Sequence, residues 1–280
     1  AGTVKAGKDA VITLAEESEA AVEIPAHNPP KADEKRRLNV NFDFLQKLGK
    51  SLMTVIAVMP AAGLMISLGN ILMMCFPAGF GLMVGNTMAQ IGWAIIGNLH
   101  ILFAAAIGGS WAKEKAGGAF AAVIAFCLIN VVTGAMLGVN SGMLEDPMAV
   151  THTLLGKEIL VKDYFVDILG RPALNMGVFV GIIAGFVGAN AYNKYYNFRK
   201  LPDALSFFNG KRFVPLVVIF YSTVTAIILS VVWPVVQGGI NDFGVWIANS
   251  SSTSPILAPF IYGTLERLLL PFGLHHMLTI

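Results

Sequence analysis

The chain has 280 residues, of which 55% are apolar and only 13% are charged. Soluble domains typically carry about 25% charged residues, and several apolar stretches here reach the roughly 20 residues that a membrane span needs. The composition therefore predicts an integral membrane protein that crosses the bilayer several times. It argues against nucleic acid as a partner, since no basic stripe alternates with aromatic residues. The two cysteines lie in separate apolar segments, so we expect neither a metal site nor a cofactor.

The first 38 residues differ in composition from the rest of the chain. They carry charges of both signs and end in a proline-rich patch, which is typical of a flexible linker or of the remnant of a preceding soluble domain. Residues 39–50 then set phenylalanines beside lysines. That pattern fits either a helix lying at the membrane surface or the plain start of the first span.

Five apolar segments long enough to cross a bilayer follow. They are residues 51–76, 80–107, 119–139, 174–191 and 213–233.

Three of these segments carry further signals. The first is interrupted by Pro60, and the second is longer than one span, so it is either a kinked helix or two pieces. The fifth is expected to stop at Pro234, because proline removes an N–H from the helix ladder. A weaker apolar segment follows over residues 235–249.

The fourth segment is rich in glycine. Gly177, Gly181 and Gly185 recur every four residues, so one face of this helix can approach a neighbouring helix closely. The residues before it, 140–172, are polar and carry both signs of charge. We expect them to form a long loop outside the membrane.

The lysines and arginines predict which way the chain crosses the bilayer. The N-terminal flank and residues 113–115 and 194–212 have more basic than acidic residues, whereas residues 140–172 have more acidic ones. Cytoplasmic loops of membrane proteins carry the excess of lysine and arginine. The N-terminus is therefore predicted to be cytoplasmic.

The closing stretch, residues 257–280, is the most informative. Glu266 and Arg267 are the only charged pair within an apolar stretch, and Pro271, His275 and His276 follow them. Pro271 clashes with the carbonyl four residues back, so the helix is expected to break at Arg267. Ionisable groups at membrane depth are functional by default, and broken helices persist there when they line a cavity. We predict that this stretch lines a polar substrate site in a transporter.

Four stretches carry a resemblance to a known family, and together they run from residue 44 to the end. The chain resembles the membrane permease subunit (enzyme IIC) of the bacterial phosphoenolpyruvate:sugar phosphotransferase system, in the glucose, maltose and N-acetylglucosamine superfamily, and most closely its glucose type. The stretches are FLQKLGKSLMTVIAVMPAAGLMISLG, GRPALNMGVFVGIIAG, FFNGKRFVPL and YGTLERLLLPFGLHH.

The resemblance implies an all-α, multi-pass protein of the bacterial cell membrane that forms a homodimer. Residues 1–38 would be the linker, residues 39–212 the dimer-interface transmembrane domain, and residues 213–280 the start of a sugar-carrying domain. The closing stretch would lie on a re-entrant hairpin. The family also uses a glutamate in a later motif and the cysteine of a soluble IIB domain. Neither motif is in this sequence, so we expect a C-terminally truncated fragment that is inactive alone.

The same resemblance assigns the site residues. The arginine and the first histidine of the last motif lie at the sugar in this family, and here they are Arg267 and His275. Glu266 and His276 match the motif as further substrate-binding residues. His275 would act catalytically, by taking the proton of the sugar 6-hydroxyl or by orienting it, which is worth roughly 10²–10⁴-fold in rate. The phosphoryl donor would be a phosphocysteine on the IIB domain, with a IIA domain as the further partner.

Alternatives remain open at this point. Glu266 and Arg267 are also compatible with a structural ion pair. The sugar could be maltose rather than glucose. The protein could also be a proton-coupled secondary sugar transporter, with Glu266 and His275 as a proton relay, or a membrane scaffold that transports nothing. If labelled sugar emerges as its 6-phosphate, the protein is a phosphotransferase permease and neither a secondary transporter nor a scaffold.

Overall fold

A computed structural model describes the backbone of residues 32–250 and 256–269. The chain divides into two compact units, residues 1–46 and residues 47–280. The described part of the first unit is the beginning of helix α2 (Ala32–Ile56). This helix starts inside the segment that was predicted to be a linker and continues through residues 39–50.

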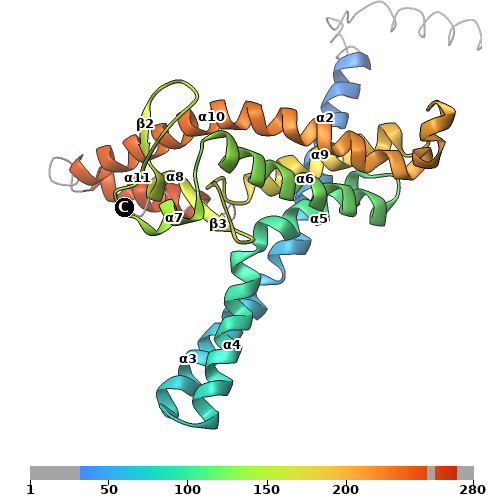
Figure 1. Cartoon of the computed structure of the whole chain (residues 1–280). Coiled ribbons are helices and arrows are strands. Elements are labelled where there is room, and N and C mark those ends of the chain that lie inside the picture. The colour runs from blue at the N-terminus through green and yellow to red at the C-terminus, as the bar shows by residue number, and fades with distance from the viewer. Residues whose placement is uncertain (1–31, 251–255, 270–280) are drawn as a thin grey trace, which may run out of the picture. The chain divides into compact units, whose positions relative to one another are not determined.

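The second unit is built mainly of helices (Figure 1). They are α3 (Met59–Cys75), α4 (Phe80–Gly97), α5 (Leu99–Trp111), α6 (Lys115–Met136), α9 (Phe179–Tyr195), α10 (Val214–Ser250) and α11 (Leu257–Leu269).

Within the described residues, three helical stretches are long and apolar enough to cross a membrane, namely Gln46–Cys75, Lys115–Met136 and Gly210–Trp246. The bent pair α4 and α5 makes a fourth if it is counted as one span. The prediction of an all-α protein with several membrane spans is therefore confirmed, with two small sheets added to it.

Both predicted interruptions in the first two segments occur. Helix α2 ends at Ile56 and α3 starts at Met59, with Pro60 in the first turn of α3, where its missing N–H leaves no bond unmade. The second segment is two helices that meet at Asn98 with a bend of 51°. The Asn98 side chain donates to the Ala94 carbonyl at 2.8 Å and so caps the end of α4.

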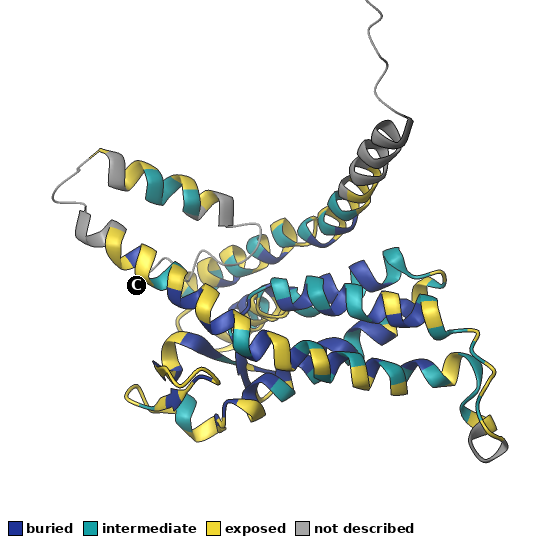
Figure 2. Cartoon of the chain, turned by 90° about the horizontal axis from the view of Figure 1, so that it is seen from above, coloured by how far each residue is buried: buried dark blue, intermediate teal, exposed yellow. Residues whose placement is uncertain are grey.

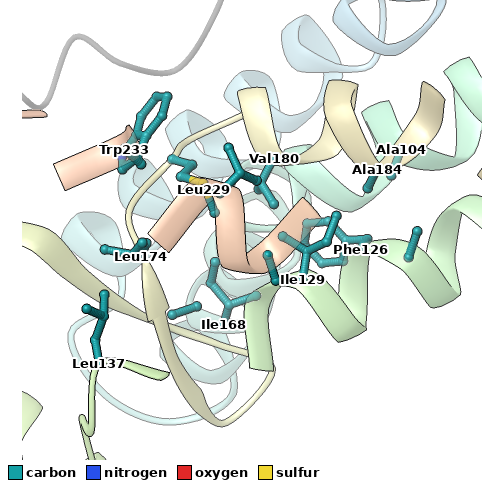
Figure 3. Packing of buried hydrophobic residues seen from close by; sticks show 14 of the residues in the cluster. Ala104, Phe126, Ile129, Leu137, Ile168, Leu174, Val180, Ala184, Leu229 and Trp233 are labelled. Carbon is teal, nitrogen blue, oxygen red and sulfur yellow. The ribbon is translucent and has the colours of Figure 1, made fainter. Parts of the chain in front are cut away.

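Helices α5, α6, α9 and α10 pack together, and buried residues concentrate where they meet (Figure 2). Phe126 and Ile129 of α6 lie against Val180 of α9, while Ala104 of α5 faces Ala184 of α9 (Figure 3). All five of these side chains are fully buried. A membrane protein gains little from excluding water in lipid, so this close side-chain packing supplies much of the association energy.

Glycines let α9 approach its neighbours. A methyl group placed on Gly181 would meet the backbone of α5 at His100, and one on Gly188 would meet the backbone of α6 at Ala122. Gly185 packs in the same way against Ile107 of α5. The predicted close-approach face is thus confirmed for Gly181 and Gly185, and Gly188 extends it by a position that was not predicted. Gly177 does not belong to it, because it lies before the helix with a left-handed φ of 52°.

The predicted polar loop over residues 140–172 contains regular structure. It forms α7 (Ser141–Glu145), β1 (Val150–His152), β2 (Glu158–Leu160), α8 (Val161–Tyr164), β3 (Phe165–Ile168) and β4 (Arg171–Leu174).

The strands form two antiparallel hairpins. Strand β1 pairs with β2 in the register Val150↔Leu160, and β3 pairs with β4 in the register Ile168↔Arg171. The second hairpin turns through Leu169 and Gly170, which both have positive φ. Since β4 includes the first residue of the predicted fourth span, the expectation of a helix from residue 174 was wrong. The left-handed Gly177 delays the helix start to Phe179.

Helix α10 also differs from the prediction, because it continues through Pro234 for 37 residues. Tertiary hydrogen bonds hold the turns on both sides of the proline. Trp233 Nε1 donates to the Asn175 carbonyl at 3.1 Å, and Gln237 Nε2 donates to the Asp163 carbonyl at 3.0 Å. These contacts compensate for the one ladder bond that proline removes, so Pro234 does not end the helix.

Candidate functional site

The predicted substrate site falls on α11 and on the residues after it. Arg267 lies in the last turn of α11 and its side chain is exposed. Glu266 precedes it on the same helix, but its side chain lies outside the described residues, as do His275 and His276 entirely. Of the four predicted side chains the structure thus describes only that of Arg267, and any contact among the four lies outside the described residues.

Helix α11 is continuous through both charged positions to Leu269, so the predicted break does not fall at Arg267. Pro271 lies outside the described residues. A proline at that position removes the hydrogen bond to the Arg267 carbonyl, and the last four carbonyls of a helix have no partner in the ladder anyway. Helical structure at Arg267 is thus compatible with the proline that follows.

The exposed face of α11 carries Phe260, Thr264 and Arg267. Spacings of four and three residues put these side chains on one side of a helix. The Thr264 hydroxyl donates to the Phe260 carbonyl at 2.7 Å, and the intervening residues 261–263 are less exposed. Helix α11 packs against α10. The Arg267 guanidinium accordingly points away from the hydrophobic core.

A network of polar side chains joins three elements at one end of the bundle. The Glu114 carboxylate, in the turn between α5 and α6, accepts a hydrogen bond from the Tyr192 hydroxyl of α9 at 2.7 Å. The same oxygen atom pairs with Lys211 Nζ, just before α10, also at 2.7 Å. Lys211 first, and the Tyr192 hydroxyl second, lower the pKa of the Glu114 carboxyl group. Glu114 is therefore ionised at neutral pH.

Asn193 reinforces this junction from the next position of α9. Its Oδ1 accepts a hydrogen bond from the Lys113 backbone N–H at 2.7 Å, and its Nδ2 donates to the Trp111 carbonyl at 2.9 Å. One side chain thus satisfies backbone groups at the end of α5, which would otherwise lack a partner. The junction is a structural tie between helices.

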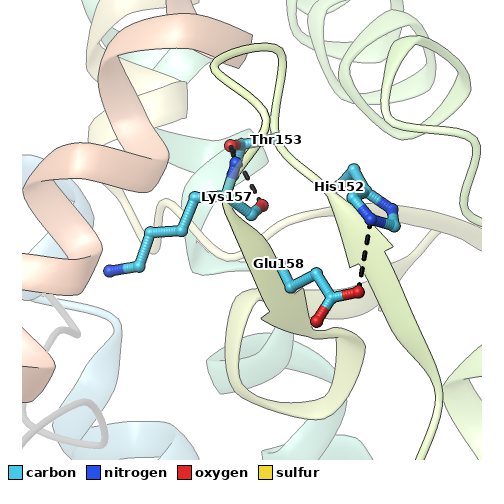
Figure 4. A network of polar contacts seen from close by, with 4 residues as sticks. All are labelled: His152, Thr153, Lys157 and Glu158. Carbon is cyan, nitrogen blue, oxygen red and sulfur yellow. Dashed lines mark hydrogen bonds and ion pairs between the residues drawn. The ribbon is translucent and has the colours of Figure 1, made fainter.

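A second polar region lies on the β1–β2 hairpin (Figure 4). His152 Nε2 pairs with Glu158 Oε1 at 3.3 Å across the two strands. The Thr153 hydroxyl accepts from the Lys157 backbone N–H at 3.0 Å and donates to the Lys157 carbonyl at 3.1 Å. These bonds rigidify the turn of the hairpin. Lys157 reaches away from the His152–Glu158 pair (Figure 4).

No group of three histidine, cysteine, aspartate or glutamate side chains that could hold a metal ion occurs in the part of the chain that the structure describes. Cys75 is exposed and Cys127 is half-buried, and both are free thiols.

Comparison with known proteins identifies the family. The family model of the phosphotransferase system EIIC domain matches residues 49–280. The chain belongs to the EIIC family of the phosphotransferase system. It is 69% identical over 242 residues to the glucose-specific EIICBA component of Streptococcus pneumoniae, a match that covers 86% of this chain and 33% of that protein. It is 38% identical over 244 residues to the glucose-specific EIICBA component of Staphylococcus carnosus, which covers 84% and 34%.

This EIIC chain spans about a third of the length of the curated relatives that it matches. The resemblance inferred from four sequence stretches is confirmed, and the matched residues include α11 and the closing motif. What sequence reasoning missed in the EIIC chain is the polar junction around Glu114 and the hairpin beside α10. The Glu114 junction joins residues from separate elements, and the hairpin meets residues of α10 that lie far away along the chain, so neither arrangement forms a sequence motif.

Proposed function

We propose that this chain is part of a permease that carries glucose across the cytoplasmic membrane and couples transport to phosphorylation of the sugar 6-hydroxyl. The observation that carries the proposal is the 69% identity to a glucose-specific EIICBA component. A second glucose-specific component, from another genus, also matches. These relatives favour glucose over maltose, and a phosphotransferase mechanism over proton coupling.

In this proposal the closing motif binds the sugar. Arg267 donates hydrogen bonds to sugar hydroxyls from its planar guanidinium group, and its exposure on α11 leaves the guanidinium accessible to a ligand. Glu266 accepts from hydroxyls, and His276 adds a further contact. His275 is the catalytic residue that takes or orients the proton of the 6-hydroxyl while the phosphoryl group arrives.

The phosphoryl donor in this proposal is a phosphocysteine of a IIB domain, which a IIA domain recharges. The relatives are EIICBA components, which supports the action of such domains together with this chain. The complex as a whole is then a sugar phosphotransferase. The donor meets the sugar on the cytoplasmic side, because the phosphorylated carriers are soluble domains.

Orientation and assembly belong to the same proposal. The excess of lysine and arginine in residues 113–115 and 194–212 supports a cytoplasmic N-terminus. The chain then forms a homodimer through residues 39–212, while residues 213–280 begin the sugar-carrying domain with its re-entrant hairpin. The irregular stretch of two short 3₁₀ helices, Asp203–Phe208 and Gly210–Phe213, lies at that division.

The test uses the full-length protein in membrane vesicles, with labelled glucose, phosphoenolpyruvate and the phosphorylated carrier proteins. We expect the label to emerge as glucose 6-phosphate and expect excess unlabelled glucose to compete better than maltose. Arg267→Ala and His275→Ala are expected to abolish product formation at unchanged expression. Uptake of unmodified sugar that collapses with the proton gradient would refute the proposal, and stronger competition by maltose would reassign the substrate.

A further inference from the structure

A cavity of about 300 Å³ lies between the β1–β2 hairpin and α10, just beyond Pro234. Thr153 and Lys157 of the hairpin line one side, and Gly238 and Asp242 of α10 line the other. Ligand pockets measure about 300–1,000 Å³, so this cavity fits a small ligand of monosaccharide size. None of the residues that line it comes from the closing motif.

The floor of the cavity is a glycine on a fixed helix. A methyl group on Gly238 would lie 3.2 Å from the Tyr164 hydroxyl oxygen and 3.9 Å from Lys157 Nζ. The missing side chain therefore lets a phenol and an ammonium group converge over α10. The helix is held here by the bonds of Trp233 and Gln237 described above, so the floor does not depend on the ligand for its position.

The charged groups at the cavity are available to a ligand. Among the described residues the ion pairs are His152–Glu158 and Lys211–Glu114, so Lys157 and Asp242 line one cavity without pairing with each other. The backbone of Lys157 is fixed by the Thr153 hydroxyl, whereas its side chain extends from the hairpin (Figure 4).

Tyr164 adds a neutral donor. Burial first, and the nearby Asp242 carboxylate second, raise the pKa of its hydroxyl, so the phenol keeps its proton at neutral pH. The cavity then presents the three N–H donors of an ammonium and the acceptor oxygens of a carboxylate, and the phenol O–H lies beside its floor at Gly238. A sugar hydroxyl both donates and accepts, so neighbouring hydroxyls match this set. The charges of Lys157 and Asp242 cancel, so the cavity has no net attraction for the anionic group of a sugar phosphate and suits an uncharged ligand.

We propose that this cavity is a second binding site for an uncharged hexose, placed on the face of the membrane from which the sugar enters. The inference rests on the proposed function and on the cytoplasmic N-terminus given there. Residues 140–172, which carry more acidic than basic residues, then lie outside the cell. The cavity would collect sugar before it reaches the site around Arg267. Its role is to supply substrate, and it takes no part in phosphoryl transfer.

The test compares two routes to the inner site in cells that contain the full-length protein and its carriers. Intact cells must take glucose from outside, whereas permeabilised cells expose the cytoplasmic side directly. We expect Lys157→Met and Asp242→Asn to lower the rate of uptake at low glucose roughly tenfold, the loss that follows from one hydrogen bond to a charged group. Saturating glucose restores uptake, and phosphorylation in permeabilised cells is unchanged.

Lys162→Met is the matched control, since Lys162 is an exposed lysine of α8 that does not line the cavity. Gly238→Ala narrows the cavity without removing a charge, and we expect it to weaken uptake in the same way. If a charge variant fails to accumulate in the membrane, Gly238→Ala decides the question.

Normal uptake at low glucose in all three cavity variants would overturn the inference, as would an equal loss in intact and permeabilised cells. Failure of the proposed function is recognised separately, because the unmodified protein would then make no glucose 6-phosphate in either preparation.

Discussion

Gly181→Ala tests whether the close approach of α9 to α5 stabilises the bundle. The added methyl group would overlap the His100 carbonyl oxygen, and would lie 3.0 Å from its carbon and 3.3 Å from the Ala104 nitrogen. All three atoms belong to the backbone of α5, so no side-chain rotation can relieve the contact. The two helices have to move apart along this face.

The size of the effect follows from two opposing terms. Alanine is a better helix former than glycine by about 1 kcal/mol, and that gain applies at any position inside a helix. Overpacking a close-packed interior costs about 1–3 kcal/mol, and sometimes more. The suitable control is Gly63→Ala in α3, where an added methyl group has no atom within 4 Å. The propensity gain cancels between the two variants, so the cost of overpacking remains.

We would measure the Tm of each purified variant in the same detergent. A difference of 1–3 kcal/mol corresponds to a gap of about 2–12 °C between the variants for a protein of this size class. Gly181→Ala should unfold below the unmodified protein or close to it, and Gly63→Ala at or above it. Equal Tm values for the two variants would refute the conclusion that close backbone contact between α5 and α9 requires glycine.

Three further predictions concern polar groups. Trp233→Phe removes the donor shared by the half-buried Asn175 carbonyl and the buried Gln237 Oε1. It should destabilise the protein by about 1–3 kcal/mol in thermal unfolding, whereas the exposed Trp246→Phe should not. Glu114→Gln should lower Tm at pH 7. Partners hold the Glu114 pKa below 4.5 in the folded state, so the stability that the carboxylate contributes is present above pH 4.5 and is lost as the pH falls further. The difference in Tm between Glu114→Gln and the unmodified protein should therefore close in acid. A constant difference would contradict the pairing. Arg267→Lys should raise the KM of the full-length protein for glucose phosphorylation roughly tenfold without changing Tm. The exposed Arg171→Lys is the control and should change neither quantity. An unaltered KM in Arg267→Lys would remove Arg267 from the sugar site.

Local patterns predicted much of the fold. Hydropathy is a property of consecutive residues, so the apolar segments that became α3, α6 and the first part of α10 were recognisable without tertiary information. The interruption near Pro60 was expected, because a proline acts on the helix that contains it. The length of the second segment predicted a kink or a division without its position, which the structure puts at Asn98. The glycine spacing likewise predicted which face of α9 packs closely.

The site was only partly within reach of the sequence. Ionisable groups inside an apolar stretch singled out Glu266, Arg267, His275 and His276, and the resemblance added their roles. The family assignment then followed from comparison over residues 49–280. The structure places Arg267 on an exposed helix face, and the roles of the four residues stay predictions.

Long-range packing decided the rest. Local chemistry predicted that Pro234 ends a helix, yet hydrogen bonds to Asn175 and Asp163 carry α10 past it. The sequence also left residues 140–172 as a loop, although cross-strand pairing turns them into two hairpins. Lys157 and Asp242 share a cavity only because one hairpin lies on α10 beside a glycine. The sequence by itself determined that the chain is a helical membrane protein of the EIIC type, since hydropathy and motif are written along the chain. Which distant polar groups meet was decided by the tertiary structure, because such contacts depend on how separate elements pack.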